Sequence, residues 1–285
     1  MLKVTVYKVK PVDVLLDDGE DMIVERKRVR WGENDIMLRT RSESTVDNSG
    51  VQVWRAAFLL GDFVMAHASQ FTDETVVELG CGVGFVTLVL SSVAKLVIAT
   101  DSDVDALSLA ETNLLHNLHG ACRLRQMDWN CHGLPSSSAE FGWSNRDINA
   151  LRRARILVAS DVFYDDDITE VFLSKLCELM TENPNLVAFV AIEKRAIFSA
   201  EKLNVVHLGY DIFRANVCNH TSAPESLFHA TEPHVCAACN EVGATPRFLA
   251  SQVALESIPQ VFEYDRQGML ELWCVRGLVQ IRGHN

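Results

Sequence analysis

The chain has 285 residues, of which 48% are apolar and 22% charged, values ordinary for a globular protein that can bury a real core. The formal net charge of −12 disfavours a broad basic surface, so we expect no direct binding to nucleic acid; the charge either suits a basic protein partner or simply keeps the protein soluble. No apolar run is long enough to span a membrane, and Met1–Lys10 lacks the apolar core of a signal peptide, which predicts a protein kept inside the cell and away from membranes.

Residues 1–50 are predicted to form a small N-terminal β extension ahead of a main domain over residues 51–285. Val4–Val9 and Met22–Val29 have the composition of two strands, and Asp17-Asp18-Gly19 between them is a turn signal. The basic run Arg26–Arg30 is either a solvated strand face or a nuclear import signal.

From residue 51 onward, short apolar strands alternate with segments of helical periodicity. The apolar stripes of the expected helices fall within residues 56–67, 85–93, 104–118 (Leu115 included) and 168–179. The strands are expected at Thr75–Leu79, Leu96–Thr100, Cys122–Arg125, Arg155–Ala159 and Leu186–Ile192. This β-α-β repetition predicts an α/β fold: a Rossmann-like, seven-stranded, mostly parallel sheet with helices on both faces.

The last part of the chain is less regular. Residues 216–246 show no clear period and are predicted to be an irregular insertion, whereas Ile258–Tyr264 and Met269–Val275 are expected to pair as a C-terminal antiparallel hairpin. Cys236 and Cys239 in the insertion have a spacing that zinc uses, but a second clean pair is missing, so we predict an irregular loop and no metal site.

A glycine-rich turn follows the first strand of the main domain, in Glu78–Gly84 (Glu-Leu-Gly-Cys-Gly-Val-Gly). Glycines at such a turn let the backbone approach a ligand closely, and ligands of open α/β sheets bind beyond the carboxyl ends of the strands. The spacing is not that of the dinucleotide fingerprint, because Phe85 stands where the third glycine would be. The turn therefore predicts a ligand site, although a plain tight turn is the alternative.

Acidic and aromatic residues follow the next strands. Asp101 ends the second strand, where a carboxylate can accept the hydroxyl hydrogens of a ribose; it could also cap the next helix, but Asp103 can do that. Asp128-Trp129 follows the third strand and suits an adenine, with a core tryptophan as the alternative. Asp161 and Tyr164 follow the fourth strand, where they could line the entrance for a second substrate.

Taken together, these motifs resemble the cofactor site of the seven-β-strand methyltransferases, which use S-adenosylmethionine. Asp161-Val162-Phe163-Tyr164 is similar to the Asp/Glu-x-x-Tyr/Phe motif of one branch, the family sixteen protein methyltransferases, which mostly modify lysine in non-histone proteins. The resemblance implies that Asp161 and Tyr164 are catalytic, and that the cofactor is bound by Trp54, Glu78, Gly80, Cys81, Gly82, Gly84, Asp101, Asp128, Trp129 and Ser160. Cys81 departs from the small residue expected there, and its side chain is expected to point into the sheet.

The same resemblance implies a protein-lysine N-methyltransferase that acts on a basic, lysine-containing segment of a non-histone, nucleic-acid-binding protein. It further implies a location in the nucleus, and we expect the protein to be present also in the cytoplasm and to be a monomer. Two alternatives remain open: a methyltransferase of nucleic acid or a small molecule, and an inactive methyltransferase fold used as a scaffold. Nucleic-acid amino-methyltransferases usually carry two prolines where this chain has Val162 and Phe163, which disfavours the first alternative for nucleic acid.

Overall fold

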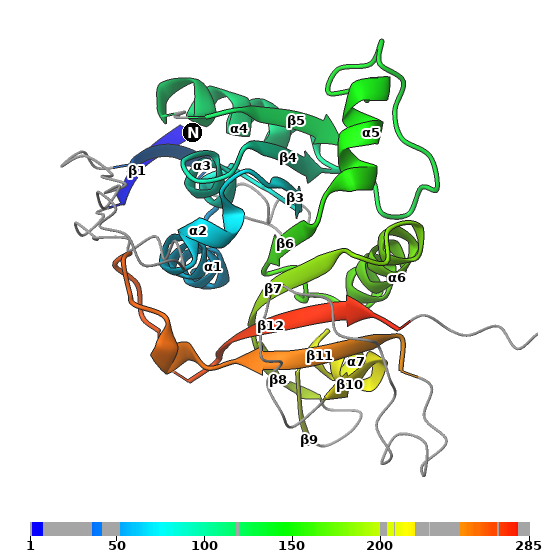
Figure 1. Ribbon diagram of the computed structural model, residues 1–285. Helices are drawn as coiled ribbons and strands as arrows, with labels where there is room; N and C mark the ends of the chain where they lie inside the picture. Colours follow the sequence, from blue (N-terminus) through cyan, green and yellow to red (C-terminus); the bar gives the residue numbers. More distant parts are fainter. Residues whose placement is uncertain are drawn as a thin grey trace, which may run out of the picture.

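The computed structural model describes residues 2–7, 36–41, 52–117, 120–199, 204–207, 209–219, 228, 246–266 and 268–278. Its centre is an eight-stranded sheet with strand order β10-β11-β12-β7-β6-β3-β4-β5 (Figure 1). Within these described residues, no helix combines the length and apolar character needed to cross a membrane.

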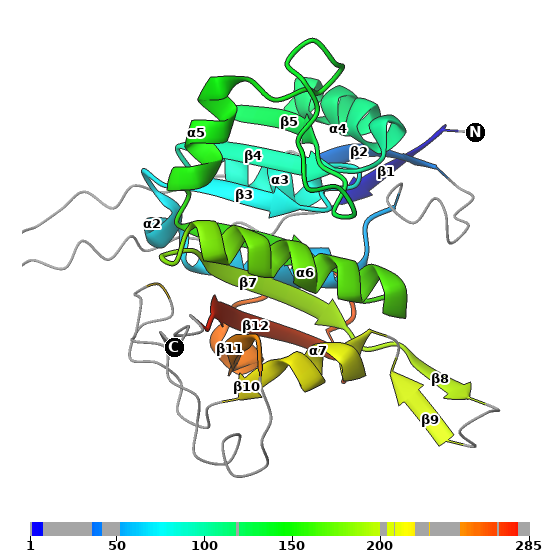
Figure 2. The same ribbon diagram turned by 90° about the vertical axis from the view of Figure 1, so that its right-hand side faces the viewer.

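The five predicted strands form the parallel part of the sheet. They are β3 (Thr75–Leu79), β4 (Leu96–Asp101), β5 (Cys122–Gln126), β6 (Ile156–Ser160) and β7 (Val187–Glu193). Four of them are buried along nearly their whole length, which explains why they are mostly apolar in the sequence. Their carboxyl ends meet at one edge of the sheet, as the arrowheads of β3 and β7 show in Figure 2.

Helices cover both faces of the sheet, as predicted. One face carries α1 (Arg55–Ala66), α2 (Ala68–Phe71), α3 (Phe85–Ser91) and α4 (Val104–Asn117), and the other carries α5 (Asn145–Arg153), α6 (Asp166–Glu182) and α7 (Tyr210–Asn216) (Figure 1). Successive strand residues contribute to opposite cores: Val76 packs with the first set of helices and Val77 with the second. The prediction for Leu115 was wrong, because this residue of α4 is 78% exposed.

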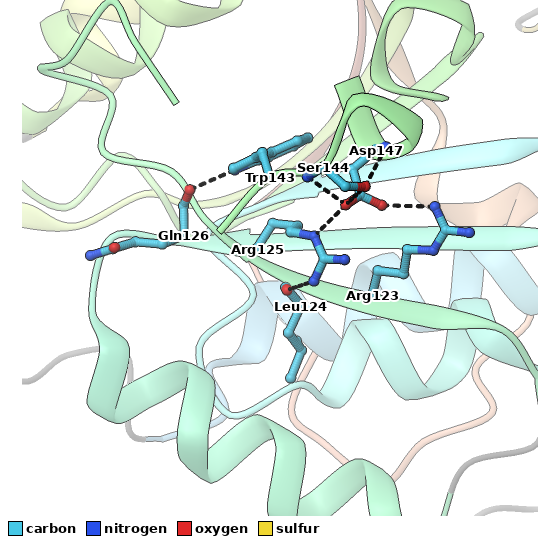
Figure 3. Close-up of polar contacts among 7 residues, drawn as sticks. All are labelled: Arg123, Leu124, Arg125, Gln126, Trp143, Ser144 and Asp147. Atoms are coloured by element: carbon cyan, nitrogen blue, oxygen red, sulfur yellow. Dashed lines mark hydrogen bonds and ion pairs between the residues drawn. The ribbon is translucent and has the colours of Figure 1, made fainter. Parts of the chain in front are cut away.

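Helix α5 was not predicted, because it is a mostly polar helix that is held by charge more than by an apolar stripe (Figure 3). It begins with a capping box between Ser144 and Asp147. The buried Asp147 carboxylate also accepts from Arg123 Nη1 at 2.7 Å and from Arg125 Nε at 2.9 Å, both on β5. Trp143 Nε1 donates to the Gln126 carbonyl at 2.7 Å. The network thus fixes both ends of the segment that follows β5.

The N-terminal extension is a separate two-stranded antiparallel sheet of β1 (Leu2–Tyr7) and β2 (Ile36–Arg41). The predicted partner strand, Met22–Val29, lies outside the described residues. Asn113 of α4 fixes β2, since its side chain accepts from Arg39 N at 2.8 Å and donates to the Arg39 carbonyl at 3.1 Å. The same amide donates to the Val83 carbonyl at 3.0 Å, so the extension is tied to the glycine turn. The proposed boundary at residue 50 remains a prediction.

The C-terminal antiparallel hairpin exists, but one of its strands is not the predicted one. β12 (Leu270–Gly277) pairs with β11 (Phe248–Val253), whereas Ile258–Tyr264, which follow the 3₁₀ helix η2 (Leu255–Ser257), form no strand. The buried Asp62 of α1 explains this. Its carboxylate accepts from Val261 N at 2.7 Å, Phe262 N at 3.1 Å and Tyr264 Oη at 2.8 Å, so donors that a strand would use are satisfied by a helix side chain.

Three short strands lie in or just before the predicted insertion. β10 (Val217–Asn219) lies inside the segment predicted to be irregular; it pairs in parallel with β11 and adds an eighth strand to the seven that were predicted. β8 (Ala196–Ser199) and β9 (Asn204–His207) form an antiparallel pair that extends from the carboxyl end of β7 (Figure 2). Most of residues 216–246, including Cys236 and Cys239, lie outside the described residues, so the prediction for this segment stays a prediction.

Candidate functional site

A cavity of about 570 Å³ lies beyond the carboxyl ends of β3, β4 and β6. Of the residues predicted for the site, all except Gly84 line this cavity. The strands bring these side chains together because a parallel sheet places the ends of successive strands at one edge.

The glycine turn adopts backbone conformations that favour glycine. Gly80, Gly82 and Gly84 have φ values of 74°, 50° and 84°. A Cβ atom on Gly80 would lie 3.5 Å from the Trp129 ring, an ordinary contact distance, so the positive φ is what favours glycine at this position. Gly84 instead serves packing: it precedes α3, and a Cβ atom there would lie 3.2 Å from the Cβ of Ala110 on α4.

Asp101 is organised by the backbone around it. Its carboxylate accepts from Gly82 N at 2.9 Å and from Asp103 N at 3.1 Å, one bond to each oxygen. Burial raises the pKa of Asp101 above its usual value. Asp103 caps α4 through a 2.8 Å bond from Asp105 N, so Asp101 is not needed as the cap. Each oxygen of Asp101 keeps an acceptor site for a ligand hydroxyl.

Glu78 lies beneath the turn as a buried carboxyl group without a cationic neighbour among its described contacts. Thr87 Oγ1 donates to its Oε2 at 2.6 Å. Burial, with a smaller contribution from the charge of Asp101, raises the pKa of Glu78 to about 8. A ligand that brings an ammonium group to this carboxyl would favour its ionised form.

Trp129 contributes an indole with one unsatisfied polar atom. Its Nε1 is buried and has no hydrogen-bond partner among the described residues. The ring packs edge-on against Phe172, with centroids 5.2 Å apart. The neighbouring Asp128 accepts from Asn130 N at 2.9 Å and keeps further acceptor capacity. An aromatic ligand with polar edges would suit this pair.

Cys81 belongs both to the cavity lining and to the apolar core. Its thiol makes only a weak contact, at 3.9 Å, with the Gly82 carbonyl. Burial raises the pKa of Cys81 well above its ordinary value, so the thiol stays protonated and unreactive.

The other half of the cavity is built around Asp161, which is buried and has a φ of 54°, a strained conformation for a residue other than glycine. Its N–H donates to the Ala191 carbonyl at 2.9 Å, and its Oδ2 accepts from Arg195 Nη2 at 2.5 Å. Burial raises the pKa of Asp161 to about 6, although the positive charge of Arg195 opposes the rise.

Two aromatic rings accompany Asp161. The guanidinium of Arg195 lies 4.8 Å from the centroid of the Trp54 ring and 5.7 Å from that of Tyr164. We did not predict Arg195 as a site residue. It lies two residues beyond the end of the fifth parallel strand, at the edge where ligands bind, and this position was the signal that could have indicated it.

The acidic run after Asp161 has a partly structural purpose. Asp165 caps α6 by accepting from Ile168 N at 3.0 Å, and Asp166 accepts from Gly209 N at 2.8 Å. Asp165 is therefore the carboxylate that caps the start of α6. Asp167 is exposed and lines the cavity, where its charge adds negative potential.

Comparison with known proteins identifies the class. The profile of the lysine methyltransferase family matches residues 33–206, and the chain belongs to this family. Methyltransferase-like protein 22 of Homo sapiens is 31% identical over 276 residues, covering 93% of this chain and 63% of that protein. The Mus musculus protein of the same name is 30% identical over 275 residues, covering 93% and 65%. The chain thus spans just under two thirds of the length of these relatives.

A more distant relative is the protein-lysine N-methyltransferase EFM3 of Chaetomium thermophilum, 25% identical over 163 residues and covering 56% of this chain and 47% of that protein. These matches confirm the resemblance to the family sixteen branch. Within that branch the sequence motifs resemble methyltransferase-like protein 22 in particular, and the two relatives of that name bear this out.

The cavity fits S-adenosylmethionine, the cofactor of this family. Asp101 has an acceptor site on each oxygen, Glu78 is a buried carboxyl group without a cationic neighbour among its described contacts, and Trp129 has an unsatisfied N–H donor. These groups match the ribose hydroxyls, the ammonium and the adenine of that molecule. The role of each individual residue stays a prediction.

Proposed function

We propose that this protein is an S-adenosylmethionine-dependent protein-lysine N-methyltransferase, acting on a basic, lysine-containing segment of a non-histone, nucleic-acid-binding protein. One observation carries the proposal beyond family membership. The buried carboxylate of Asp161 binds a cationic side chain, that of Arg195, beside the rings of Trp54 and Tyr164 in the lining of the cofactor cavity. Such a place suits a lysine side chain, since a cation against an aromatic face gains about 0.5–2 kcal/mol.

The cofactor would be held in one half of the cavity by the residues described above. Asp101 would accept from the ribose, Glu78 would orient the ammonium, and Asp128 with Trp129 would enclose the adenine. When bound, S-adenosylmethionine supplies a methyl group that its positively charged sulfur has already activated. The chain's own contribution is therefore to fix the geometry and to exclude water.

The other half of the cavity, around Asp161, has to place a neutral lysine amine in line with the methyl group that it receives. The ordinary pKa of lysine is about 10.4, so at neutral pH about one amine in a thousand is neutral. The pKa of Asp161 is about 6, far below that of lysine, so its carboxylate holds and orients the amine while the proton leaves to water. Tyr164 and Trp54 supply the aromatic walls.

Charge supports a basic protein partner. Asp103, Asp128, Asp165 and Asp167 all line the cavity, and the whole chain carries a net charge of −12. Negative potential at an opening attracts a basic peptide and repels nucleic acid. We extend the proposal to a monomer located in the nucleus and also in the cytoplasm, on the family resemblance and on the basic run Arg26–Arg30, which lies outside the described residues.

The test is a labelling experiment. The purified protein is incubated with tritiated S-adenosylmethionine and a cell extract that includes nuclei, beside an Asp161→Ala control. We expect label in a protein band that survives nuclease and is absent in the control, and mass spectrometry of that band should place the methyl group on lysine. Label only in nuclease-sensitive material would favour a nucleic-acid substrate. Cofactor binding without any label, in extracts from several cell types, would favour a scaffold.

A further inference from the structure

Arg195 occupies the place that the proposed function assigns to the substrate's amine. It lies between β7 and β8, immediately after Glu193 and Lys194. Its guanidinium contacts Asp161 at 2.5 Å and lies against Trp54 and Tyr164, the same three groups that would receive a lysine side chain. Two cations in this small space would repel each other, so the guanidinium and a substrate ammonium compete for one carboxylate.

The burial of Asp161 makes this competition selective for cationic ligands over neutral ones. Its side chain is only 4% exposed, and a buried carboxylate that loses its partner carries a large penalty unless another cation replaces it. A neutral ligand cannot compensate for the loss of Arg195, whereas an ammonium can. Arg195 itself is 30% exposed, so it can move towards water without opening the core.

The other charged groups around Asp161 do not take over this function. Glu193, at the end of β7, is paired with Arg55 at the start of α1. Glu193 raises the pKa of Asp161 and Arg55 lowers it, both by charge, and the effect of Arg195 is larger than either. Arg195 is thus the main cation that keeps Asp161 ionised in the free protein.

We infer that Arg195 is a specificity-determining residue, which holds the amine subsite in the free protein and is displaced only by a ligand that brings its own positive charge. This inference rests on the function proposed above and adds the means by which the site selects a cationic side chain. Arg195 acts through Asp161 and is not placed among the reacting atoms.

The test uses n-butylammonium chloride as a stand-in for the lysine side chain, with the intrinsic tryptophan fluorescence of the full chain as the signal. Ionic strength is held constant with sodium chloride, and 1-butanol is the neutral comparison. We expect Arg195→Gln to bind n-butylammonium about tenfold more tightly than the parent, which corresponds to about 1.4 kcal/mol. The matched control is Arg155→Gln, since Arg155 forms an exposed ion pair with Glu74 away from the cavity, and it should leave binding unchanged.

A pH series separates this inference from a structural role. Without Arg195 the Asp161 carboxylate takes up a proton more readily, so the pH below which n-butylammonium no longer binds should rise by about one unit in Arg195→Gln. Arg195→Lys keeps a cation and should lie between the parent and Arg195→Gln in both measurements. It serves as the test if Arg195→Gln does not fold.

Unchanged or weaker amine binding in the folded variants, or an unmoved pH limit, would overturn the inference. Calorimetry with S-adenosylmethionine distinguishes this failure from that of the proposed function. If the parent binds the cofactor and only the amine data fail, Arg195 has no selective role. If the parent binds no cofactor, the proposed function itself fails.

Discussion

The Asp147 network offers the sharpest test of how this fold is held together (Figure 3). The change Asp147→Asn keeps the size of the side chain and removes its charge. In the native structure, the carboxylate accepts from the Ser144 N–H at 3.0 Å, from the Ser144 hydroxyl at 2.6 Å, and from Arg123 and Arg125. An amide cannot accept all of these, and its NH₂ group would face donors.

The expected loss of unfolding free energy follows from how deeply these hydrogen-bonded groups are buried. Asp147 is 1% exposed, and removing one partner of a buried ion pair costs about 3–5 kcal/mol. The two arginine side chains are 21% and 23% exposed, so water can partly solvate them, which puts the loss near the lower end, at about 3 kcal/mol. For a chain of 285 residues, that loss lowers Tm by about 5 °C.

The pH dependence gives a second, independent check. Burial alone raises the pKa of Asp147, but hydrogen bonds from Ser144, Arg125 and Arg123 outweigh burial and hold the pKa well below its usual range. A lowered pKa means that the carboxylate stabilises the fold above its unfolded pKa of about 3.9, and that this contribution is lost as the pH falls. The difference between the parent and Asp147→Asn should therefore be full at pH 6 and shrink below about pH 4.

The assay is urea denaturation at pH 6 and at several lower pH values, followed by circular dichroism. Glu140→Gln is the matched control: it removes a carboxylate from an exposed position in the same segment and should change stability by less than about 0.5 kcal/mol. A loss in Asp147→Asn no larger than that of the control, or a loss that persists unchanged in acid, would refute the reasoning.

Three further predictions concern the cavity. Asp161→Asn should lower turnover by at least about a hundredfold while calorimetry shows S-adenosylmethionine binding within about twofold of the parent; full activity or lost cofactor binding would contradict the assigned role. Asp101→Asn should weaken cofactor binding by about 10- to 100-fold, because hydrogen bonds to a charged acceptor contribute about 1.5–3 kcal/mol; calorimetry on the folded variant measures this, and unchanged affinity would exclude the ribose contact. Because Asp161 must be ionised and its pKa is about 6, kcat/KM should fall as the pH drops below that value, and a flat acid limb would argue against this carboxylate.

Much of the fold could be predicted because its strands are buried on both faces. Thr75–Leu79 and Leu96–Asp101 are mostly apolar, with Val76, Val77 and Val97–Ala99 at their centres, and such runs are recognisable without knowledge of their neighbours. The strand predicted at Ile258–Tyr264 was wrong, because its outcome depends on a residue far away in the sequence. Its composition suits a strand, but Asp62, about two hundred residues earlier in the chain, satisfies its backbone donors.

The residues of the candidate site also divide into those that the sequence predicts and one that it does not. Gly80, Gly82, Asp101, Asp128 and Trp129 follow strand ends, and their order along the chain predicts that they meet at one edge of the sheet. Their position in one cavity agrees with that expectation. The partner of Asp161 could not be predicted, because nothing in the local sequence distinguishes Arg195 from Lys194 beside it.

The sequence by itself therefore determined the elements whose chemistry is local: the buried parallel strands, the glycine turn and the carboxylates that follow strand ends. Only the tertiary structure decided the pairings between distant groups, such as Arg195 with Asp161, Asp147 with Arg123 and Arg125, and Asp62 with Val261. The physical reason is that a hydrophobic period is written in neighbouring residues, whereas a buried charge is satisfied by whichever donor the packing of the chain brings within about 3 Å.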